Sequence, residues 1–195
     1  MIQSCHSMSM NMKTKKRLNK KMIFAGVAGA AILLIGGASV VRAQKQTKQT
    51  TPTEINLRSL DGSNVLIYGL KTPAVLAVGA SWLPLSRDQI KIINALQQNY
   101  AKRGVTIYFI STDSANAKSN NYATDAQLTT FGERGKLGVK TLRDPDGATV
   151  KAFGLDQIPA FVVLNKDGGV AAKFTGIDPE TDITAQISAE IDKIL

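Results

Sequence analysis

The chain has 195 residues and a formal net charge of +9, which leaves room for one ordinary domain and an additional segment. Residues 1–50 contain 9 of the 24 basic residues and none of the 15 acidic ones, so residues 51–195 hold 15 of each and are neutral overall. Because a nucleic-acid-binding domain carries its positive field on its folded part, this distribution excludes nucleic acid as a partner of residues 51–195.

The N-terminal charge lies next to an uncharged apolar stretch. Residues 1–21 are basic, and no residue from Met22 to Val41 is charged. Twenty helical residues span about 30 Å, the thickness of the hydrocarbon core of a bilayer. Because cytoplasmic flanks carry the excess of Lys and Arg, we expect segment 1–21 in the cytoplasm and a transmembrane anchor within residues 22–43, which crosses the membrane through residues 22–41.

A cleaved signal peptide is the alternative interpretation of the same stretch. Val41-Arg42-Ala43 has the small residues of a cleavage site, and cleavage after Ala43 would secrete the rest of the chain. The apolar run is longer than the roughly 7–15 residues of a signal peptide, which favours the anchor. Both interpretations place residues 51–195 on the extracytoplasmic side.

Cys5 is the only cysteine and His6 the only histidine, and both precede the apolar stretch. The exported part therefore has no thiol, no disulfide and no Cys or His ligand, and it has no glycine-rich nucleotide loop. We expect it to bind no metal and no cofactor. Residues 44–53, rich in Gln, Thr and Lys, predict an extended polar tether.

From residue 54 to residue 195 the pattern is that of an α/β domain, in which short apolar strands alternate with amphipathic helices and Asp-Gly turns. In chain order the expected elements are a hairpin of strands 55–57 and 65–67 around Asp61-Gly62, a buried strand at 74–78, a helix from Ser86 to Gly104, a strand at 105–110, a weaker helix at 125–134, a strand ending in the turn 142–147, a short helix at 149–153, a hairpin of strands 161–164 and 170–174, and a last helix with Ile183, Ile187, Ile191 and Ile194 on one face. This order predicts a mixed sheet with helices on both faces.

The start of the first long helix carries a local signature of its own. Ser86-Arg87-Asp88-Gln89 has the spacing of a capping box, in which the Ser86 hydroxyl accepts a hydrogen bond from a backbone N–H and Gln89 reaches back. We interpret Ser86 as this cap. A nucleophilic serine would need a general base, and the only histidine precedes the membrane segment.

The segment Ala80-Ser81-Trp82-Leu83-Pro84-Leu85-Ser86-Arg87 resembles a thioredoxin-type active site. In the extracytoplasmic thiol–disulfide oxidoreductases and redoxins, the peroxiredoxin-related group, this site reads Trp-Cys-Pro-Pro-Cys-Arg. The resemblance runs from about Ile55 to Leu195 and includes Asp61-Gly62, Asp144-Pro145-Asp146-Gly147, Phe153-Gly154-Leu155, Ile158-Pro159, Asp167-Gly168 and Gly176. It implies a thioredoxin-like fold for residues 54–195.

The resemblance also implies which chemical groups are absent. It places the nucleophilic cysteine at Leu83 and the resolving cysteine at Ser86, neither of which can form a thiolate. It places a proton-transferring Glu at Gln89, which cannot titrate, and a Pro at Lys91. Because several parts of one mechanism are missing together, we interpret the chain as having lost the Cys-x-x-Cys and its redox activity.

A docking surface is a further implication of the resemblance. Trp82 matches a residue beside the family's active site, and Pro159 matches its cis-proline, before which the backbone of Ile158 would face an extended peptide. The alternatives are that Trp82 is a half-buried ring covering the first helix and that Pro159 only shapes the turn into the next strand. The candidate partner-binding surface comprises Trp82, Leu83, Pro84, Leu85, Ile158 and Pro159.

These observations predict an exported, membrane-tethered thioredoxin-like domain that binds a protein or an extended peptide and is not an enzyme. The enzymatic alternative, a thiol–disulfide oxidoreductase or peroxidase-like redoxin, requires that Cys5 or a partner supply the thiol. A structural envelope protein that assembles through its outer faces is the third hypothesis.

Overall fold

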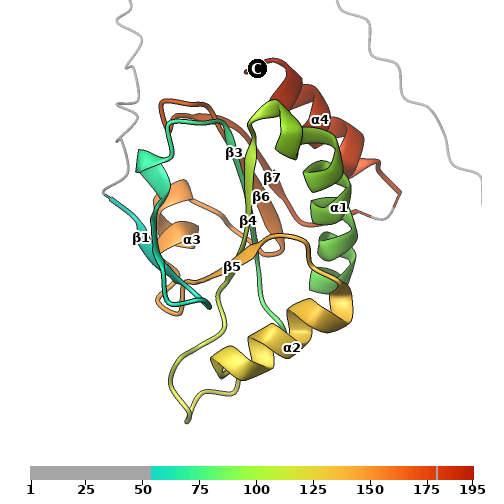
Figure 1. Ribbon diagram of the computed structural model, residues 1–195. Coiled ribbons are helices and arrows are strands. Elements are labelled where there is room, and N and C mark those ends of the chain that lie inside the picture. Colours follow the sequence, from blue (N-terminus) through green and yellow to red (C-terminus); the bar gives the residue numbers. More distant parts are fainter. Residues whose placement is uncertain (1–53, 179) are drawn as a thin grey trace, which may run out of the picture. The chain divides into compact units, whose positions relative to one another are not determined.

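Seven strands form one mixed sheet in the part of the chain that the computed structural model describes, residues 54–178 and 180–195 (Figure 1). The basic segment, the membrane or signal helix and the tether expected within residues 1–53 lie outside the described residues. Among the described residues, no helix is both long enough and apolar enough to cross a bilayer.

The elements follow one another in the predicted order. The strands are β1 (Asn56–Ser59), β2 (Asn64–Leu66), β3 (Ala74–Gly79), β4 (Thr106–Ser111), β5 (Lys140–Arg143), β6 (Ala160–Leu164) and β7 (Val170–Thr175). The helices are α1 (Leu85–Tyr100), α2 (Asp125–Gly135), α3 (Ala148–Phe153) and α4 (Ile183–Asp192), and short 3-10 turns follow β2 and α1. The α/β architecture expected for residues 54–195 is confirmed.

The strand order across the sheet is β2-β1-β5-β4-β3-β6-β7. Strands β3, β4 and β5 are parallel neighbours joined by crossovers through α1 and α2, whereas β1, β2, β6 and β7 pair antiparallel with their neighbours. Helices α1 and α4 cover one face of the sheet, and α3 covers the other (Figure 1).

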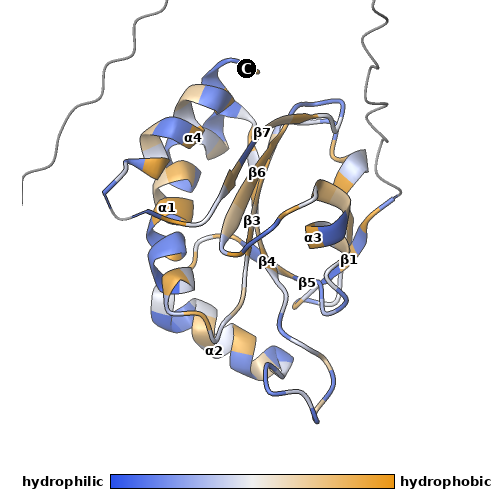
Figure 2. Ribbon diagram, turned by 180° about the vertical axis from the view of Figure 1, so that it is seen from behind, coloured by the Kyte–Doolittle hydropathy of each residue, from blue (hydrophilic) through white to orange (hydrophobic). Residues whose placement is uncertain are grey.

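Alternate residues of β3 face two separate apolar clusters. Ala74, Leu76 and Val78 pack in the cluster that includes Phe153 of α3, while the intervening side chains pack in the cluster that includes α1 and α4. Every residue of β3 is buried, and a strand buried on both faces gives the continuous apolar run that predicted it. The apolar sheet lies between helices whose outer faces are hydrophilic (Figure 2).

The Asp61-Gly62 turn joins β1 and β2 as predicted, and side chains hold it in place. Gly62 has φ +84°, a conformation that glycine adopts without strain. The Asp61 carboxylate pairs with Lys140 Nζ at 2.8 Å and accepts a hydrogen bond from the Ser63 N–H at 2.9 Å. Lys140, with Ser63 adding to its effect, holds the pKa of Asp61 well below its usual value, and Asp61 raises the pKa of Lys140.

Three loops meet at the carboxyl end of β3. Strands β3 and β4 are parallel and pair as far as Gly79 with Ser111, so the segments that follow them leave the sheet at the same edge. Strand β6 runs antiparallel to β3 and pairs Ala160 with Val78, so the residues before Ala160 reach that edge too. Ligands of open α/β sheets bind outside this edge, which makes it the place to look for a site.

Candidate functional site

Helix α1 begins one residue before Ser86, and the predicted capping box at Ser86 and Gln89 is wrong. Pro84 is the N-cap residue, has helical backbone angles and makes no side-chain cap. Ser86 therefore lies inside the first turn, where its backbone N–H donates to the Leu83 carbonyl at 3.1 Å. Its fully buried Oγ instead accepts a hydrogen bond from the Ala80 N–H at 3.2 Å. Ser86 thus fastens the turn to the helix that follows it.

Gln89 lies beneath the turn and bridges two strands of the sheet. Its side chain is fully buried, and Nε2 donates to the Val78 carbonyl of β3 at 3.2 Å and to the Ala160 carbonyl of β6 at 3.0 Å. An amide can satisfy both carbonyls because its nitrogen carries two hydrogens. Gln89 is therefore a neutral link between β3 and β6 at the position where the resemblance places a titrating Glu.

The absence of a side chain at Gly79 leaves the space that these two residues use. A Cβ at Gly79 would lie 2.5 Å from Gln89 Oε1 and 2.9 Å from Ser86 Oγ. Both atoms belong to buried side chains held by hydrogen bonds, so neither can move aside at low cost. Glycine is the residue that this packing allows at the end of β3.

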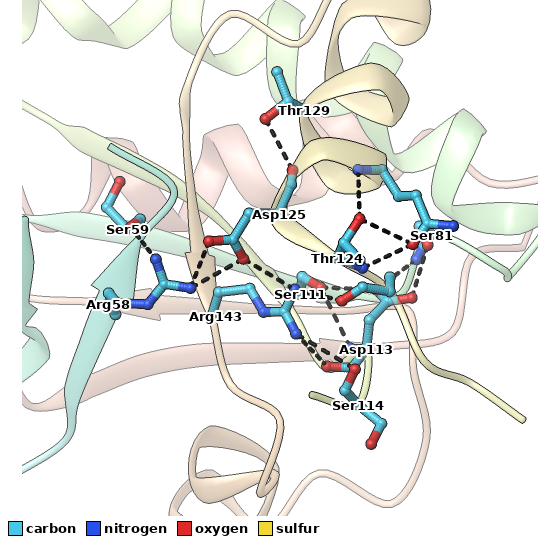
Figure 3. Close-up of polar contacts among 12 residues, drawn as sticks. Arg58, Ser59, Ser81, Ser111, Asp113, Ser114, Thr124, Asp125, Thr129 and Arg143 are labelled. Carbon is cyan, nitrogen blue, oxygen red and sulfur yellow. Dashed lines mark hydrogen bonds and ion pairs between the residues drawn. The ribbon is translucent and has the colours of Figure 1, made fainter. Parts of the chain in front are cut away.

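Asp113, in the loop after β4, holds the other side of the turn. Its carboxylate is 1% exposed and accepts hydrogen bonds from the Ser81 N–H at 2.8 Å, the Ser81 Oγ at 2.7 Å and the Ser111 Oγ at 2.7 Å. Figure 3 shows Ser81 and Ser111 converging on it. Hydrogen bonds to an ionised group are the strong ones, so Asp113 fixes the backbone that presents Trp82.

Arg143, at the end of β5, supports the loop that carries Asp113. This buried guanidinium donates to the carbonyls of Ala123 at 2.7 Å and of Asp113 at 3.4 Å, and Nη1 pairs with Asp125 at 3.3 Å. Arg58 of β1 pairs with the same Asp125 carboxylate at 2.7 Å (Figure 3). The network links three strands to the loop, and the sequence interpretation assigned none of these residues to a site. The sequence contained one indication of this network: the segments that follow parallel strands leave the sheet at the same edge, so their polar residues can meet there.

Removing the Asp113 carboxylate should loosen the turn. We expect Asp113→Ala to lower the free energy of unfolding by about 2–4 kcal/mol, because three hydrogen bonds to one charged group are lost. Asp113→Asn keeps the shape and one acceptor oxygen and should cost about half as much. Urea unfolding followed by far-UV circular dichroism measures both, and a loss below about 0.5 kcal/mol for Asp113→Ala would show that Asp113 does not hold the turn.

Beside the turn lies a groove of about 430 Å³, which we call the Trp82–Ile158 groove after two of the residues that line it. Residues of the loop after β4, of the turn after β5, of α3 and of the segment before β6 form the rest of its walls. Trp82 is 54% exposed, so about half of its surface is open to a partner. Of the six candidate binding residues, the groove brings together Trp82 and Ile158.

The other four candidates lie next to the groove without lining it. Leu83, Pro84 and Leu85 follow Trp82 on the same turn, where Leu83 is half-buried and the other two are exposed. Pro159 is buried, and the Ile158–Pro159 peptide bond is cis, as the resemblance implied. Within the described residues, the N–H and C=O of Ile158 form no backbone hydrogen bond. The main chain of Ile158 is thus available at the edge of the groove.

The strand order, helices on both faces, and a long helix starting beside the cis Ile158–Pro159 bond define a thioredoxin-like domain. The sequence model of the Redoxin family matches residues 37–189, most of the chain. The chain belongs to the Redoxin family, and the resemblance found in its sequence is confirmed.

Solved structures with this fold include several proteins named for thiol–disulfide chemistry. A putative thiol:disulfide interchange protein DsbE from Chlorobium tepidum is 18% identical, with a TM-score of 0.60 over 73% of this chain and 94% of that one. A secreted disulfide oxidoreductase from Mycobacterium tuberculosis is 19% identical, with a TM-score of 0.56 over 72% and 96%. An exposed lipoprotein thioredoxin from Streptococcus pneumoniae is 15% identical, with a TM-score of 0.56 over 72% and 99%. At these identities the likeness shows the fold, and no curated protein matches the chain.

Proposed function

We propose that residues 54–195 bind an extended segment of a partner protein in the Trp82–Ile158 groove, without exchanging disulfides. The observation that carries this proposal is the pairing of an exposed Trp82 with an unpaired main chain at Ile158 along one groove. The positions where a redoxin of this type would carry its dithiol hold Leu83 and Ser86, and residues 54–195 contain no cysteine. The groove can hold a peptide, but this domain cannot form a mixed disulfide with it.

The recognition mode follows from the groups that the groove presents. The N–H and C=O of Ile158 can pair with the backbone of an extended peptide, which is a form of strand addition. Trp82 offers a large, rigid apolar surface with few rotatable bonds, and tryptophan is enriched among residues that dominate binding energy. Leu85, 39% exposed on the same turn, extends the apolar surface beyond the groove.

We further propose that the domain acts outside the cytoplasm, tethered by residues 22–41. The uncharged stretch and its basic flank support this placement. Two of the structural neighbours are described as a secreted protein and as an exposed lipoprotein, which agrees with such a location. The enzymatic alternative is favoured by family membership, and it needs a thiol from Cys5 or from a partner.

Site-specific photo-crosslinking tests the proposal in cells. A photo-crosslinking amino acid at Ile158 of the full-length protein, expressed in its native cells, should capture one recurrent partner, and Trp82→Ala should reduce that capture about tenfold or more. The same amino acid at Lys166, an exposed residue outside the groove, is the positional control. Equal capture at both positions, or capture that Trp82→Ala leaves unchanged, would contradict docking in the groove and would favour assembly through other faces.

A further inference from the structure

A second groove lies on the other side of the Trp82 turn, between α1 and α2. This α1–α2 groove has a volume of about 900 Å³ and is lined by ten residues: Ser81, Arg87, Ile90, Lys91, Ala126, Gln127, Thr130, Phe131, Arg134 and Gly135. Figure 1 shows the C-terminal end of α2 beside the N-terminal end of α1. Ser81 precedes Trp82, so the two grooves flank the same turn.

Hydrogen bonds and close packing fix the position of α2 relative to α1, and so fix the two walls of the α1–α2 groove. Asn94 of α1 donates to the Lys136 carbonyl at 3.0 Å and accepts from the Gly138 N–H at 2.9 Å, so it ties α1 to the end of α2. A Cβ at Gly135 would lie 2.5 Å from Ile90 Cδ1, which shows how closely the helices pack at this point. The groove is therefore a built feature of the helix packing.

The charge of this groove differs from that of the domain around it. Residues 51–195 are neutral overall, yet the groove is lined by Arg87, Lys91 and Arg134 and by no acidic residue. Lys91 pairs with Asp88 at 2.8 Å, whereas neither arginine forms an ion pair within the described residues. Every other arginine of the described chain has an acidic partner. Two unpaired guanidinium groups therefore face one concave surface.

Arg87 occupies a position that α1 by itself disfavours. It lies in the first turn of the helix, where the helix dipole favours acidic residues and opposes a cation. Arg134 lies in the last turn of α2, where a cation is favourable, so only Arg87 lacks a reason within its own helix. A residue that breaks a local rule without a compensating contact is a candidate for binding. An anion in the groove would supply the missing partner for Arg87.

We propose that the α1–α2 groove binds an acidic segment of the partner protein, with carboxylates on Arg87 and Arg134. Guanidinium groups bind carboxylates through two parallel hydrogen bonds, and Ile90 and Phe131 give the groove an apolar floor. Its volume fits several residues of a peptide and is far larger than a single small anion needs. The partner's identity rests on the proposed function, because the segment would continue across the turn from the Trp82–Ile158 groove.

Crosslinking from within this groove tests the inference separately from capture at Ile158. Full-length protein in phosphatidylcholine vesicles, with a photo-crosslinking amino acid at Thr130, is mixed with a biotinylated peptide of alternating Glu and Leu. Thr130 lines the groove, and its neighbour Thr129 is exposed but does not line it, so Thr129 is the matched control position. Because the crosslinking amino acid labels only molecules next to position 130, peptide bound to the basic residues 1–50 does not contribute to the adduct.

We expect an adduct at position 130 and little at position 129. Replacing Glu by Gln in the peptide, or using the Arg87→Glu/Arg134→Glu variant, should reduce the adduct about tenfold. Lys102→Glu/Lys166→Glu removes the same charge from exposed residues outside the groove and should leave it unchanged. Arg87→Glu suits the dipole of α1, whereas Arg134→Glu opposes that of α2. Arg87→Glu alone should therefore also reduce the adduct, and its loss of binding cannot be ascribed to a weakened helix.

Three results would overturn the inference. They are equal labelling by the Glu and Gln peptides, insensitivity to Arg87→Glu/Arg134→Glu, and labelling of lipid rather than peptide when phosphatidylglycerol is added to the vesicles. The last result would make this face a membrane-binding surface. A different result would separate the two proposals. If position 130 captures the Glu peptide in preference to the Gln peptide, but no partner is captured at Ile158, the proposed function is refuted and the acidic-peptide site is retained.

Discussion

A Leu83→Cys/Ser86→Cys variant should reduce insulin disulfides in the presence of dithiothreitol, whereas the parent chain should not. Both are made in a Cys5→Ser background so that no other thiol is present. The turn that would carry the dithiol is intact: the Leu83 N–H donates to the Ala80 carbonyl at 3.2 Å, and α1 begins two residues later. The domain therefore lacks the two sulfur atoms but has the turn and the helix N-terminus on which a dithiol would lie.

The two introduced thiols should behave differently because their surroundings differ. Position 83 is half-buried just before the N-terminus of α1, where the helix dipole stabilises a thiolate. A thiol with a pKa near 7 is about half ionised at pH 7, against about 3% for an ordinary thiol, although its lower nucleophilicity offsets part of the gain. Position 86 is fully buried. We expect iodoacetamide to alkylate Leu83→Cys about threefold faster than free cysteine and Ser86→Cys far more slowly.

The exchange itself needs both positions. The thiolate at position 83 attacks an insulin disulfide and displaces one insulin thiolate, and the thiol at position 86 then displaces the second, which leaves a disulfide in the variant for dithiothreitol to reduce. The Ser86 N–H donates to the Leu83 carbonyl at 3.1 Å, so the two positions belong to one tight turn, and a disulfide between them requires that their Cβ atoms lie about 3.5–4.5 Å apart. Leu83→Cys alone has no second thiol to resolve the mixed disulfide, which only dithiothreitol can then reduce, so its insulin reduction should be much slower than that of the double variant. A folded double variant without activity would show that this site has diverged beyond the loss of sulfur.

Insulin reduction by the unmodified chain decides between the two classes of function. Activity in the unmodified chain, which keeps Cys5, that disappears on Cys5→Ser would establish the enzymatic alternative, with the thiol supplied from the N-terminal segment. Activity at the level of buffer in both chains would support a binding module. The same assay thus tests the proposed function and the competence of the scaffold.

The order of the elements could be predicted because apolar residues recur in the sequence with the period at which a strand or a helix buries its side chains. The continuous apolar run of β3 and the spacing of Ile187 and Ile191 in α4 both reflect contacts that the sheet imposes. The Asp-Gly turns of the two hairpins followed from residues with few conformational options. These features depend on local chemistry, so one sequence was enough to find them. The position of the cis-proline was instead implied by the resemblance to the redoxins.

The capping box shows where local chemistry is insufficient. Thr124 and Gln127 carry the same Ser/Thr-x-x-Gln signature as Ser86 and Gln89, and in α2 they do form a reciprocal capping box. At α1 the helix begins earlier, and the amide of Gln89 reaches the carbonyls of Val78 and Ala160 instead. The second carbonyl is 71 residues away in the sequence. No local pattern distinguishes these two outcomes, because a long-range partner decides between them.

The residues of the α1–α2 groove were missed for a related reason. Arg134 fits the description of a solvated helix-end cation, which is how its sequence context presents it. Its position opposite Arg87 depends on how α2 crosses α1, and Asn94 sets that crossing through hydrogen bonds to the backbone after α2. The charged residues could be counted from the sequence, but only the fold shows which of them lie together on one surface.

Gln89→Glu should make the stability of the domain strongly dependent on pH. The carboxyl group would lie fully buried against two carbonyl oxygens, and a protonated acid has a single hydrogen to offer them. Burial and the facing carbonyls disfavour the charged form, so the pKa in the folded state should rise well above the ordinary value of about 4.3. We expect a loss of about 1–2 kcal/mol at pH 4, where the acid is protonated in both states and one carbonyl loses its donor.

The additional loss should appear as the pH rises. Because the folded-state pKa is raised above the unfolded one, stability is retained below about pH 4 and falls as the pH climbs through the interval between the two values. With a folded-state pKa at or above 7, the variant should be about 3–4 kcal/mol less stable at pH 7 than at pH 4, relative to the parent chain at each pH. Such a loss is a large share of the stability of an ordinary domain.

Gln89→Leu separates the charge from the lost hydrogen bonds. It removes both donors and adds no ionisable group, so its cost should be the same at pH 4 and pH 7. Urea unfolding by far-UV circular dichroism at the two pH values gives the comparison. If Gln89→Glu instead shows a pH-independent stability close to that of the parent chain, the space beneath the turn tolerates a carboxylate. Gln89 would then not be required as a neutral link. Gln89→Glu could in that case be combined with the Leu83→Cys/Ser86→Cys variant to restore a titrating acid beneath the dithiol. The expected result makes Gln89 a neutral structural link between β3 and β6 beneath the Trp82 turn.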